Sequence, residues 1–478
     1  MDHASGRIGP EFELLRTVNC FTSEEDFQSE DWEAWQQYAN WYIHHIKATF
    51  LAWVGADLGF RNALPLLLPV EGKEGAGSPP PLIPNTRDII SLLIVVTSSI
   101  RRGRSSMVEI LDELRKSREG GQESDRLMNH RLSLPPNDEN PAAYEGSRAC
   151  QALFVLMSWI LLLYTTAQQS PPGLFRLHLN DPSDNRKTLR SYSWTQLSCP
   201  VSCDLAGLRF EHLVNHFGHL KFQRLPSQPR WNTAVSASNV NYFILSRVAR
   251  VRVVWVEALS LHLEFDRRTS TLKLFRFPSF CAMLSVPRAS KATIFDHVNL
   301  PADHQLSLFS AGNDIQSQAH TDSQQTDPYS QDFFVEVLCS LRLIFGQNSR
   351  SRDLYRKSFQ KPGEFGIDKD PLLDQICGAP SHQCDLFDRI DALPERSIYS
   401  PQHDFPYLGQ RLLELQDFVT AQNPADLRTL WYDVRDLNRY WTFWAVFIFG
   451  VASIFLTVIQ TILTGLQLAS MASGNGNK

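Results

Sequence analysis

The stretch WTFWAVFIFGVASIFLTVIQTIL, residues 441–463, divides this chain into a large N-terminal part and a short tail. It lies in a run from Tyr440 to Asn477 that contains no Lys, Arg, Asp, Glu or His. A bilayer core about 30 Å thick requires roughly 20 apolar residues in one helix, and a helix satisfies its own backbone polar groups. The run therefore predicts one membrane-spanning helix within residues 438–469.

The charged residues around this helix predict its orientation. Arg428, Arg435 and Arg439 precede it, and only Lys478 follows it. Cytosolic flanks of membrane helices carry an excess of Lys and Arg. The N-terminal part is therefore expected in the cytosol, with residues 470–478 on the far side, as in a single-pass, tail-anchored protein.

The composition is that of a globular body rather than of a strongly charged chain. The 478 residues are 43% hydrophobic and 20% charged, with a formal net charge of −5. This length suffices for two or three domains. The acidic balance argues against general binding of nucleic acid, which depends on the neutralisation of phosphates. The eight cysteines are too sparse for a secreted, disulfide-rich fold.

Polar segments divide the body, and two of them, residues 117–147 and 311–331, are predicted linkers. The predicted organisation is an N-terminal helical region 1–116, the linker 117–147, a central α+β region 148–310, the linker 311–331, a C-terminal helical region 332–437, the membrane helix 438–469 and the tail 470–478.

Helical periodicity predicts most elements of the body. Helices are expected over residues 31–50, 88–116 (one helix or a pair), 332–344 and 405–419. Residues 152–163 are almost all apolar, and they fit either a second membrane span or a buried helix. The run is shorter than the roughly 18 residues that indicate a span, so the buried helix is favoured.

The segment from Asn241 to Ala282 predicts a helix followed by a β-hairpin. Apolar residues have helical spacing over 242–261, whereas residues 262–265 and 271–275 alternate around the turn DRRTS. This order is similar to a winged helix in topology only. The expected fold is mainly α-helical with one small β-hairpin, as a cytosolic body plus one C-terminal transmembrane helix.

Three tracts resemble a known group of proteins. They are Trp255 to Cys281 (WVEALSLHLEFDRRTSTLKLFRFPSFC), Leu341 to Tyr355 (LRLIFGQNSRSRDLY) and Trp431 to Gln460. These tracts are similar to a group of uncharacterised filamentous-fungal proteins that have a membrane helix near the carboxy terminus. Some members are labelled CorA-like, after the magnesium channel. The resemblance implies a helical cytosolic body on a membrane helix.

Ion transport, as a degenerate CorA-like relative, is the first alternative function. Such a pore requires a second span and a Gly-Met-Asn filter after the first one, but the residues after this helix read MASGN, 471–475. The chain contains no phosphate-binding Gly-rich loop, nucleophile motif or dinucleotide fingerprint. We therefore expect a non-enzymatic interaction or regulatory module, with no catalytic residue and no cofactor.

Small and polar residues recur on one side of the predicted membrane helix. This seam consists of Gly450, Ser453, Thr457, Gln460, Thr464 and Gln467. Small residues let two helices approach closely in lipid, and Ser, Thr and Gln form hydrogen bonds between helices. Two interpretations stay open: the seam pairs with a second copy or a partner helix, or its polar side chains bond their own backbone.

Four residues have the side chains that zinc prefers. Cys199, Cys203, His212 and His216 follow the spacing C-x3-C-x8-H-x3-H. Common zinc fingers place about 12 residues between the two pairs, so an amphipathic helix with surface histidines is favoured over a metal site.

Positive charge is concentrated between Asn241 and Lys291, a segment that contains nine basic residues and three acidic ones. The basic patch is represented by Arg247, Arg250, Arg267, Arg268, Lys273 and Arg276. Such a patch binds anionic lipid or, less expected here, nucleic acid. The favoured alternative is a solvated face that acidic segments neutralise. Membrane lipid is the first expected partner, followed by a homo-oligomer or a partner helix.

Overall fold

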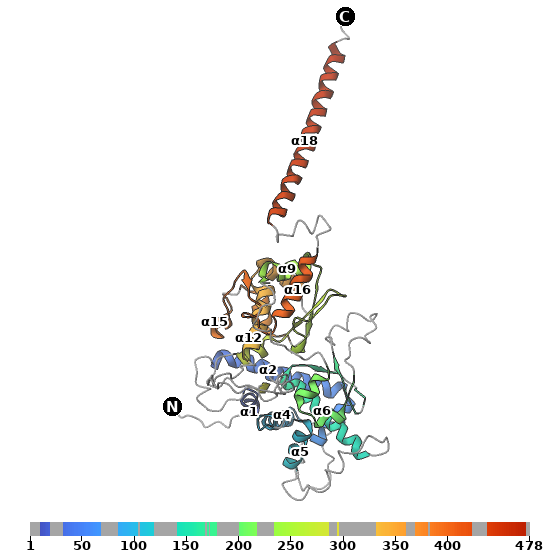
Figure 1. Ribbon diagram of the computed structural model, residues 1–478, viewed down its shortest axis with the longest axis vertical. Helices are drawn as coiled ribbons and strands as arrows, with labels where there is room; N and C mark the ends of the chain where they lie inside the picture. Colours follow the sequence, from blue (N-terminus) through green and yellow to red (C-terminus); the bar gives the residue numbers. More distant parts are fainter. Residues whose placement is uncertain are drawn as a thin grey trace, which may run out of the picture.

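A computed structural model describes residues 10–19, 32–67, 85–103, 106–118, 141–167, 170–171, 173–178, 200–217, 234–285, 294–295, 331–359, 369–380, 383–422 and 437–474. These residues are mostly helical, with a few small strands, as the sequence predicts. Figure 1 shows a folded body and one long helix, α18 (Leu437–Gly474), that projects from it. The predicted linker 311–331 and most of 117–147 lie outside the described residues.

The N-terminal half of the body is built from helices. They are α1 (Pro10–Val18), α2 (Trp32–Ala56), α3 (Leu58–Leu67), α4 (Thr86–Arg101), α5 (Met107–Arg118) and α6 (Pro141–Leu161). The helix predicted over 31–50 is therefore longer than expected, and the segment 88–116 is a pair of helices. The helix α6 begins at Pro141, so the last residues of the predicted linker 117–147 are helical.

The apolar residues 152–163, which fit either a second membrane span or a buried helix, lie in and just after the helix α6, and they are buried in the body. Leu153, Leu156 and Ile160 have no exposed surface, and α6 packs against α3 and α5. A helix that is apolar on all sides belongs in a core or a membrane. Among the described helices, only the segment Trp441–Ser470 of α18 is long and apolar enough to cross a bilayer.

Short strands and turns follow α6. The strand β1 (Thr165–Thr166) pairs antiparallel with β3 (Leu177–His178), and β2 (Leu174–Phe175) pairs antiparallel with β4 (Val201–Ser202). The turn before β2 requires a positive φ, which Gly173 adopts at 80°. The 3₁₀ helix η4 (Cys203–Gly207) and α7 (Phe210–Asn215) complete this region.

The segment 242–261 differs from the predicted single helix. The helix α9 (Tyr242–Arg247) is short, and β6 (Arg252–Val256) is a strand that pairs in parallel with β8 (Thr271–Phe275). Three of the five residues of β6 are valines, whose β-branched side chains favour strands. Arg250, with φ of 54°, interrupts the helical conformation before them.

The predicted hairpin is present as part of this small sheet. The strand β7 (Phe265–Asp266) pairs antiparallel with β8, and the strand order is β6-β8-β7. The 3₁₀ helix η5 (Leu259–Leu261) lies in the connection between β6 and β7. The central position of β8 explains why its side chains are the most deeply buried of the three strands.

The C-terminal half of the body surrounds the helix α10. Its remaining elements are β5 (Val235–Ser236), α8 (Ala237–Val240), α10 (Pro278–Ser285), α12 (Gln331–Leu341), the π-helix η6 (Arg342–Gly346), α13 (Ser349–Phe359), α14 (Pro371–Gly378), α15 (Leu386–Arg389), β9 (Ile398–Tyr399) and α16 (Gly409–Ala421). The strands β5 and β9 pair antiparallel. The helices predicted over 332–344 and 405–419 correspond to α12 with η6 and to α16.

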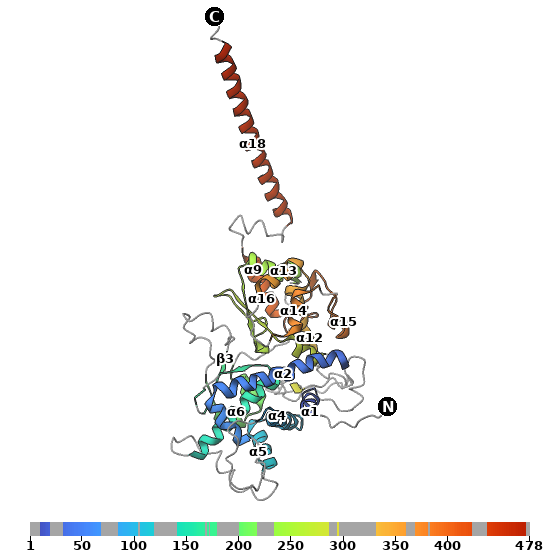
Figure 2. The ribbon, with the colours of Figure 1, turned by 180° about the vertical axis from the view of Figure 1, so that it is seen from behind.

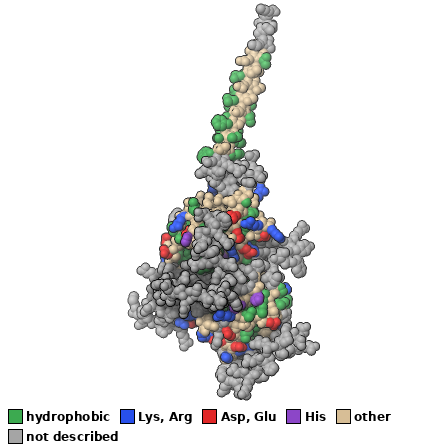
Figure 3. All heavy atoms as spheres, viewed as in Figure 1, with side chains coloured by type: hydrophobic (Ala, Val, Ile, Leu, Met, Phe, Trp, Pro, Cys, Tyr) green, Lys and Arg blue, Asp and Glu red, His purple; other side chains and the backbone are tan. Residues whose placement is uncertain are grey.

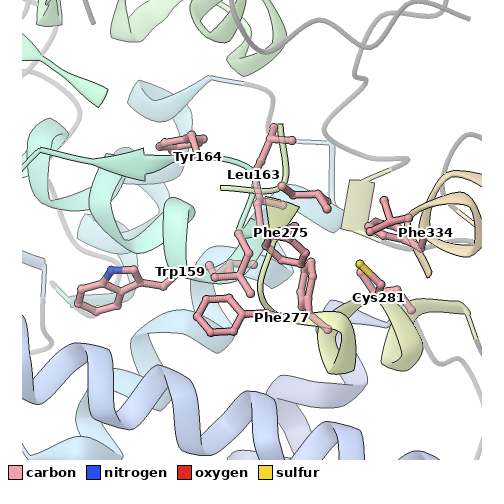
Figure 4. Packing of buried hydrophobic residues seen from close by; sticks show 14 of the residues in the cluster. Trp159, Leu163, Tyr164, Phe275, Phe277, Cys281 and Phe334 are labelled. Carbon is pink, nitrogen blue, oxygen red and sulfur yellow. The ribbon is translucent and has the colours of Figure 1, made fainter. Parts of the chain in front are cut away.

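One hydrophobic core joins the two halves. The helix α10 packs against α2 of the N-terminal half and against α12 and α14 of the C-terminal half. The indole Nε1 of Trp35 donates a hydrogen bond to the carbonyl oxygen of Met283 at 2.9 Å, across the α2–α10 contact. Figure 4 shows Phe275, Phe277 and Cys281 between Trp159 on one side and Phe334 on the other.

Candidate functional site

The helix α18 is the most exposed apolar element of the described chain. Its segment Trp441–Ser470 has 30 residues, none of them buried, and Phe449 and Phe455 expose 73% and 66% of their surface. A helix of this length extends about 45 Å, which matches a bilayer of roughly 40–45 Å with its headgroups. Figure 3 shows hydrophobic side chains along this helix, whereas charged side chains are distributed over the body.

The seam residues lie along α18, and its threonines already have acceptors in the single chain. Thr457 Oγ1 donates to the carbonyl oxygen of Ser453, and Thr464 Oγ1 to that of Gln460, both at 2.8 Å. These bonds are the ones expected when polar side chains satisfy their own helix. A Cβ at Gly450 would meet no atom within 4 Å, so this position is open to a close neighbour. Pairing through the seam stays a prediction.

Five arginines of the basic segment converge at one end of the small sheet. Arg267 and Arg268 are exposed in the turn between β7 and β8. This turn is held by Asp266, whose carboxylate accepts hydrogen bonds from the Arg268 N–H at 2.9 Å and the Thr269 hydroxyl at 2.7 Å. The turn lies beside the first residue of β6, because the backbone N–H of Arg252 donates to Ser270 O at 2.8 Å.

The residues that lead into β6 extend this basic end. Arg250 is exposed just before the strand, and Arg247 is exposed in the last turn of α9. The turn, the strand and the helix therefore present Arg247, Arg250, Arg252, Arg267 and Arg268 on one part of the surface, which we call the basic end.

Lys273 and Arg276 do not belong to the basic end. The Lys273 ammonium lies 3.2 Å from the Glu264 carboxylate, and the Arg276 guanidinium pairs with Glu257. Both cationic side chains are only 11% exposed. Two of the three acidic residues of the segment thus neutralise its two most buried cations.

The helix α13 adds positive charge that sequence reasoning missed. Arg350 is exposed, and its guanidinium lies 5.5 Å from the centre of the Phe243 ring of α9. Lys357 is also exposed on α13. Residues 349–359 are about a hundred positions from α9 in the sequence, so only the packing of α13 on α9 brings these charges together.

The basic end lies on the side of the body from which α18 projects. Figures 1 and 2 show α9, and Figure 2 shows α13, at the end of the body nearest α18. Lys and Arg side chains are visible at this end in Figure 3. The helix α16, which precedes α18 in the chain, lies at the same end.

The four zinc candidates do not form a metal site among the described residues. Cys203 is buried in η4, where burial raises the pKa of its thiol, whereas His212 and His216 are exposed on and after α7. Cys199 lies outside the described residues. No cluster of three metal-binding side chains is found in the part of the chain that the structure describes.

Comparisons with protein-family models, with curated proteins and with solved structures give no match to this chain. The resemblance to filamentous-fungal proteins with a membrane helix stays a prediction. Function is therefore inferred from the chemistry of α18, the basic end and the body.

Proposed function

We propose that this protein is a single-pass membrane protein whose helical body faces the cytosol as a non-enzymatic interaction or regulatory module. The observation that carries the proposal is that no residue of the apolar segment Trp441–Ser470 of α18 is buried, although the body beside it has a hydrophobic core of its own. An apolar surface of this size is costly in water and favourable in lipid. Burial of α18 in a bilayer removes that cost without any change in the body.

Charge supports the cytosolic orientation of the body. Arg428, Arg435 and Arg439 precede the apolar segment, and no charged residue follows it before Lys478. The excess of arginine on the body side is the pattern of a cytosolic flank. A CorA-type channel would need a second span, and the described residues contain one candidate.

The basic end supports a second role, contact with anionic lipid headgroups. The helix α16 ends at Ala421 and α18 begins at Leu437, so residues 422–436 link them and extend at most on the order of 50 Å. The body therefore stays near the membrane surface. Anionic cytosolic leaflets attract Lys and Arg by about 1 kcal/mol each near the surface, and α9 of the basic end lies at the end of the body that is toward α18.

Glycosylation mapping in microsomes tests the orientation. An acceptor site placed after Ser470 should be glycosylated, and one placed within residues 311–331 should not. Glycosylation of the second site alone would reverse the proposed topology.

Truncation after Gln422 tests the single span. The truncated body should be soluble, because the described core makes no use of α18. If it remains in membranes after carbonate extraction, a second membrane segment exists and the single-pass proposal is wrong.

A further inference from the structure

A cavity of about 420 Å³ opens at the surface of the N-terminal half. It lies between the C-terminal part of α2, α3, the middle of α6 and the strands β1 and β2. Ligand pockets in proteins measure about 300–1,000 Å³, so the cavity is large enough for a small organic molecule. Figures 1 and 2 show α6 at the end of the body away from α18. The cavity is therefore separate from the proposed membrane contact.

The inner walls of the cavity are apolar and aromatic. Trp53 and Phe60 line it from α2 and α3, with ring centres 5.6 Å apart. Phe154 and Phe175 line it from α6 and β2, with ring centres 4.7 Å apart. All four side chains are at least nine-tenths buried, so the walls are rigid and favour an apolar group over water.

Two buried polar atoms at this cavity have no hydrogen-bond partner in the protein. The Thr166 hydroxyl belongs to a residue that is 3% exposed, and its Oγ1 is unpaired. The Nε of Arg176 is buried and unpaired as well, and both residues line the cavity. A buried donor without a partner costs about 1–3 kcal/mol. An acceptor atom placed in the cavity would remove this cost at two positions.

The charges that line the cavity favour a monoanion. Arg148 and Arg176 contribute two positive charges, and Asp57 contributes one negative charge. Asp57 is fixed in place, because its Oδ1 accepts the backbone N–H of Phe60 at 3.0 Å at the start of α3. A monocarboxylate places one negative charge at Arg176, whereas a dianionic phosphate would be repelled more strongly by the negative charge of Asp57.

We propose that this cavity binds an amphipathic monocarboxylate, a small molecule with one carboxylate and an apolar chain or ring. The carboxylate accepts hydrogen bonds from the Thr166 hydroxyl and from Arg176 Nε, and the apolar part lies among Trp53, Phe60 and Phe154. Charge-assisted hydrogen bonds between guanidinium and carboxylate are among the strongest in proteins. The proposal does not depend on the membrane function of α18.

Calorimetric titration of decanoate into the full-length protein in zwitterionic nanodiscs tests this proposal, with empty nanodiscs as the blank. We expect saturable binding at one site. Decanol, which lacks the charge, and decyl phosphate, which carries more of it, should bind at least several-fold more weakly. Absence of saturable decanoate binding, or tighter binding of decyl phosphate, would overturn the assignment.

Two variants separate the site from the fold. Arg176→Met should weaken decanoate binding roughly tenfold or more, since it removes a charge-assisted hydrogen bond. Thr166→Val should weaken binding several-fold without lowering the melting temperature of the free protein, because it removes an unpaired hydroxyl at nearly constant volume. Arg268→Met, at the basic end, is the matched control. Equal affinity in all three variants would show that the cavity is not the binding site.

Discussion

The carboxylate of Asp370 accepts two hydrogen bonds from Ser279, one from the hydroxyl at 2.6 Å and one from the backbone N–H at 2.7 Å. Asp370 is also the N-cap of α14, where it accepts the N–H of Leu372 at 2.9 Å. One buried side chain thus joins α10 to α14. Burial raises the pKa of Asp370 from 3.8 to about 7, in spite of these hydrogen bonds.

The variant Asp370→Asn should alter the pH dependence of stability. Because the folded pKa lies above the unfolded one, the contribution of Asp370 is full below about pH 4 and is lost as the pH rises through about 7. The free energy of unfolding of the wild-type body should therefore fall relative to the variant over this range, by at most on the order of 1.4 kcal/mol per pH unit. Urea denaturation of residues 1–422 at several pH values measures this. The control Asp417→Asn, at an exposed position, should leave the pH dependence of the free energy of unfolding unchanged. If the Asp370→Asn variant shows the same pH dependence as the wild type, the prediction is wrong.

The buried His262 should contribute to stability with the opposite pH dependence, so that its contribution is lost as the pH falls. His262 Nδ1 accepts the N–H of Phe275 at 3.1 Å, so the proton is assigned to Nε2, which lies 2.7 Å from Ser340 Oγ. Burial lowers the pKa of His262 from 6.5 to about 3. Its contribution is therefore present above about pH 6.5 and is lost as the pH falls toward 3.

The variant His262→Leu tests this assignment. At pH 8 it should destabilise the body by about 1–3 kcal/mol, because the Phe275 N–H and the Ser340 hydroxyl lose a buried partner. The difference from the wild type should shrink between pH 6.5 and 4.5, as followed by urea denaturation. The exposed His212→Leu is the control. A pH-independent difference would mean that His262 is not held in its neutral form.

Charge reversal at the β7–β8 turn should weaken lipid binding. Arg267→Glu combined with Arg268→Glu should reduce binding of residues 1–422 to phosphatidylserine liposomes by roughly tenfold or more, at about 1 kcal/mol or more per reversed charge. The loss should diminish as salt rises. Cosedimentation measures the binding. Reversal of the exposed Arg87 and Lys116 in the N-terminal half is the matched control. Equal losses in both double variants, or binding to duplex DNA but not to liposomes, would contradict a lipid-specific basic end.

Substitution at the seam should disrupt self-association of α18. Gly450→Leu and Ser453→Leu block close approach of a second helix. In a membrane self-association assay of residues 440–470, both should reduce the signal. Gly465→Leu is the matched control, because Gly465 lies about 100° around the helix from Thr464 and a Cβ there also meets no atom within 4 Å. Equal signals for seam and control variants would exclude a homo-oligomer through the seam.

Local patterns in the sequence were sufficient to predict those elements that have the same environment along their whole length. The run 441–463 is apolar on every side, so α18 could be predicted from length and composition alone. The same measure, length against the thickness of a bilayer, correctly assigned residues 152–163 to a buried helix. The DRRTS turn could also be located, because turn residues act on the backbone within a few positions.

The tertiary structure decided whatever depends on a partner distant in the sequence. Residues 252–256 have apolar spacing that fits a helix. They form a strand because they pair in parallel with β8, which lies about twenty residues later in the sequence. Lys273 and Arg276 count as surface charges in the sequence, yet Glu264 and Glu257 neutralise them where the chain folds back. The sequence by itself determined where this protein has an apolar helix. Only the packing of α13 on α9 and of β1 and β2 on α6 decided where its positive charge and its cavity lie, because such contacts join segments that no local pattern connects.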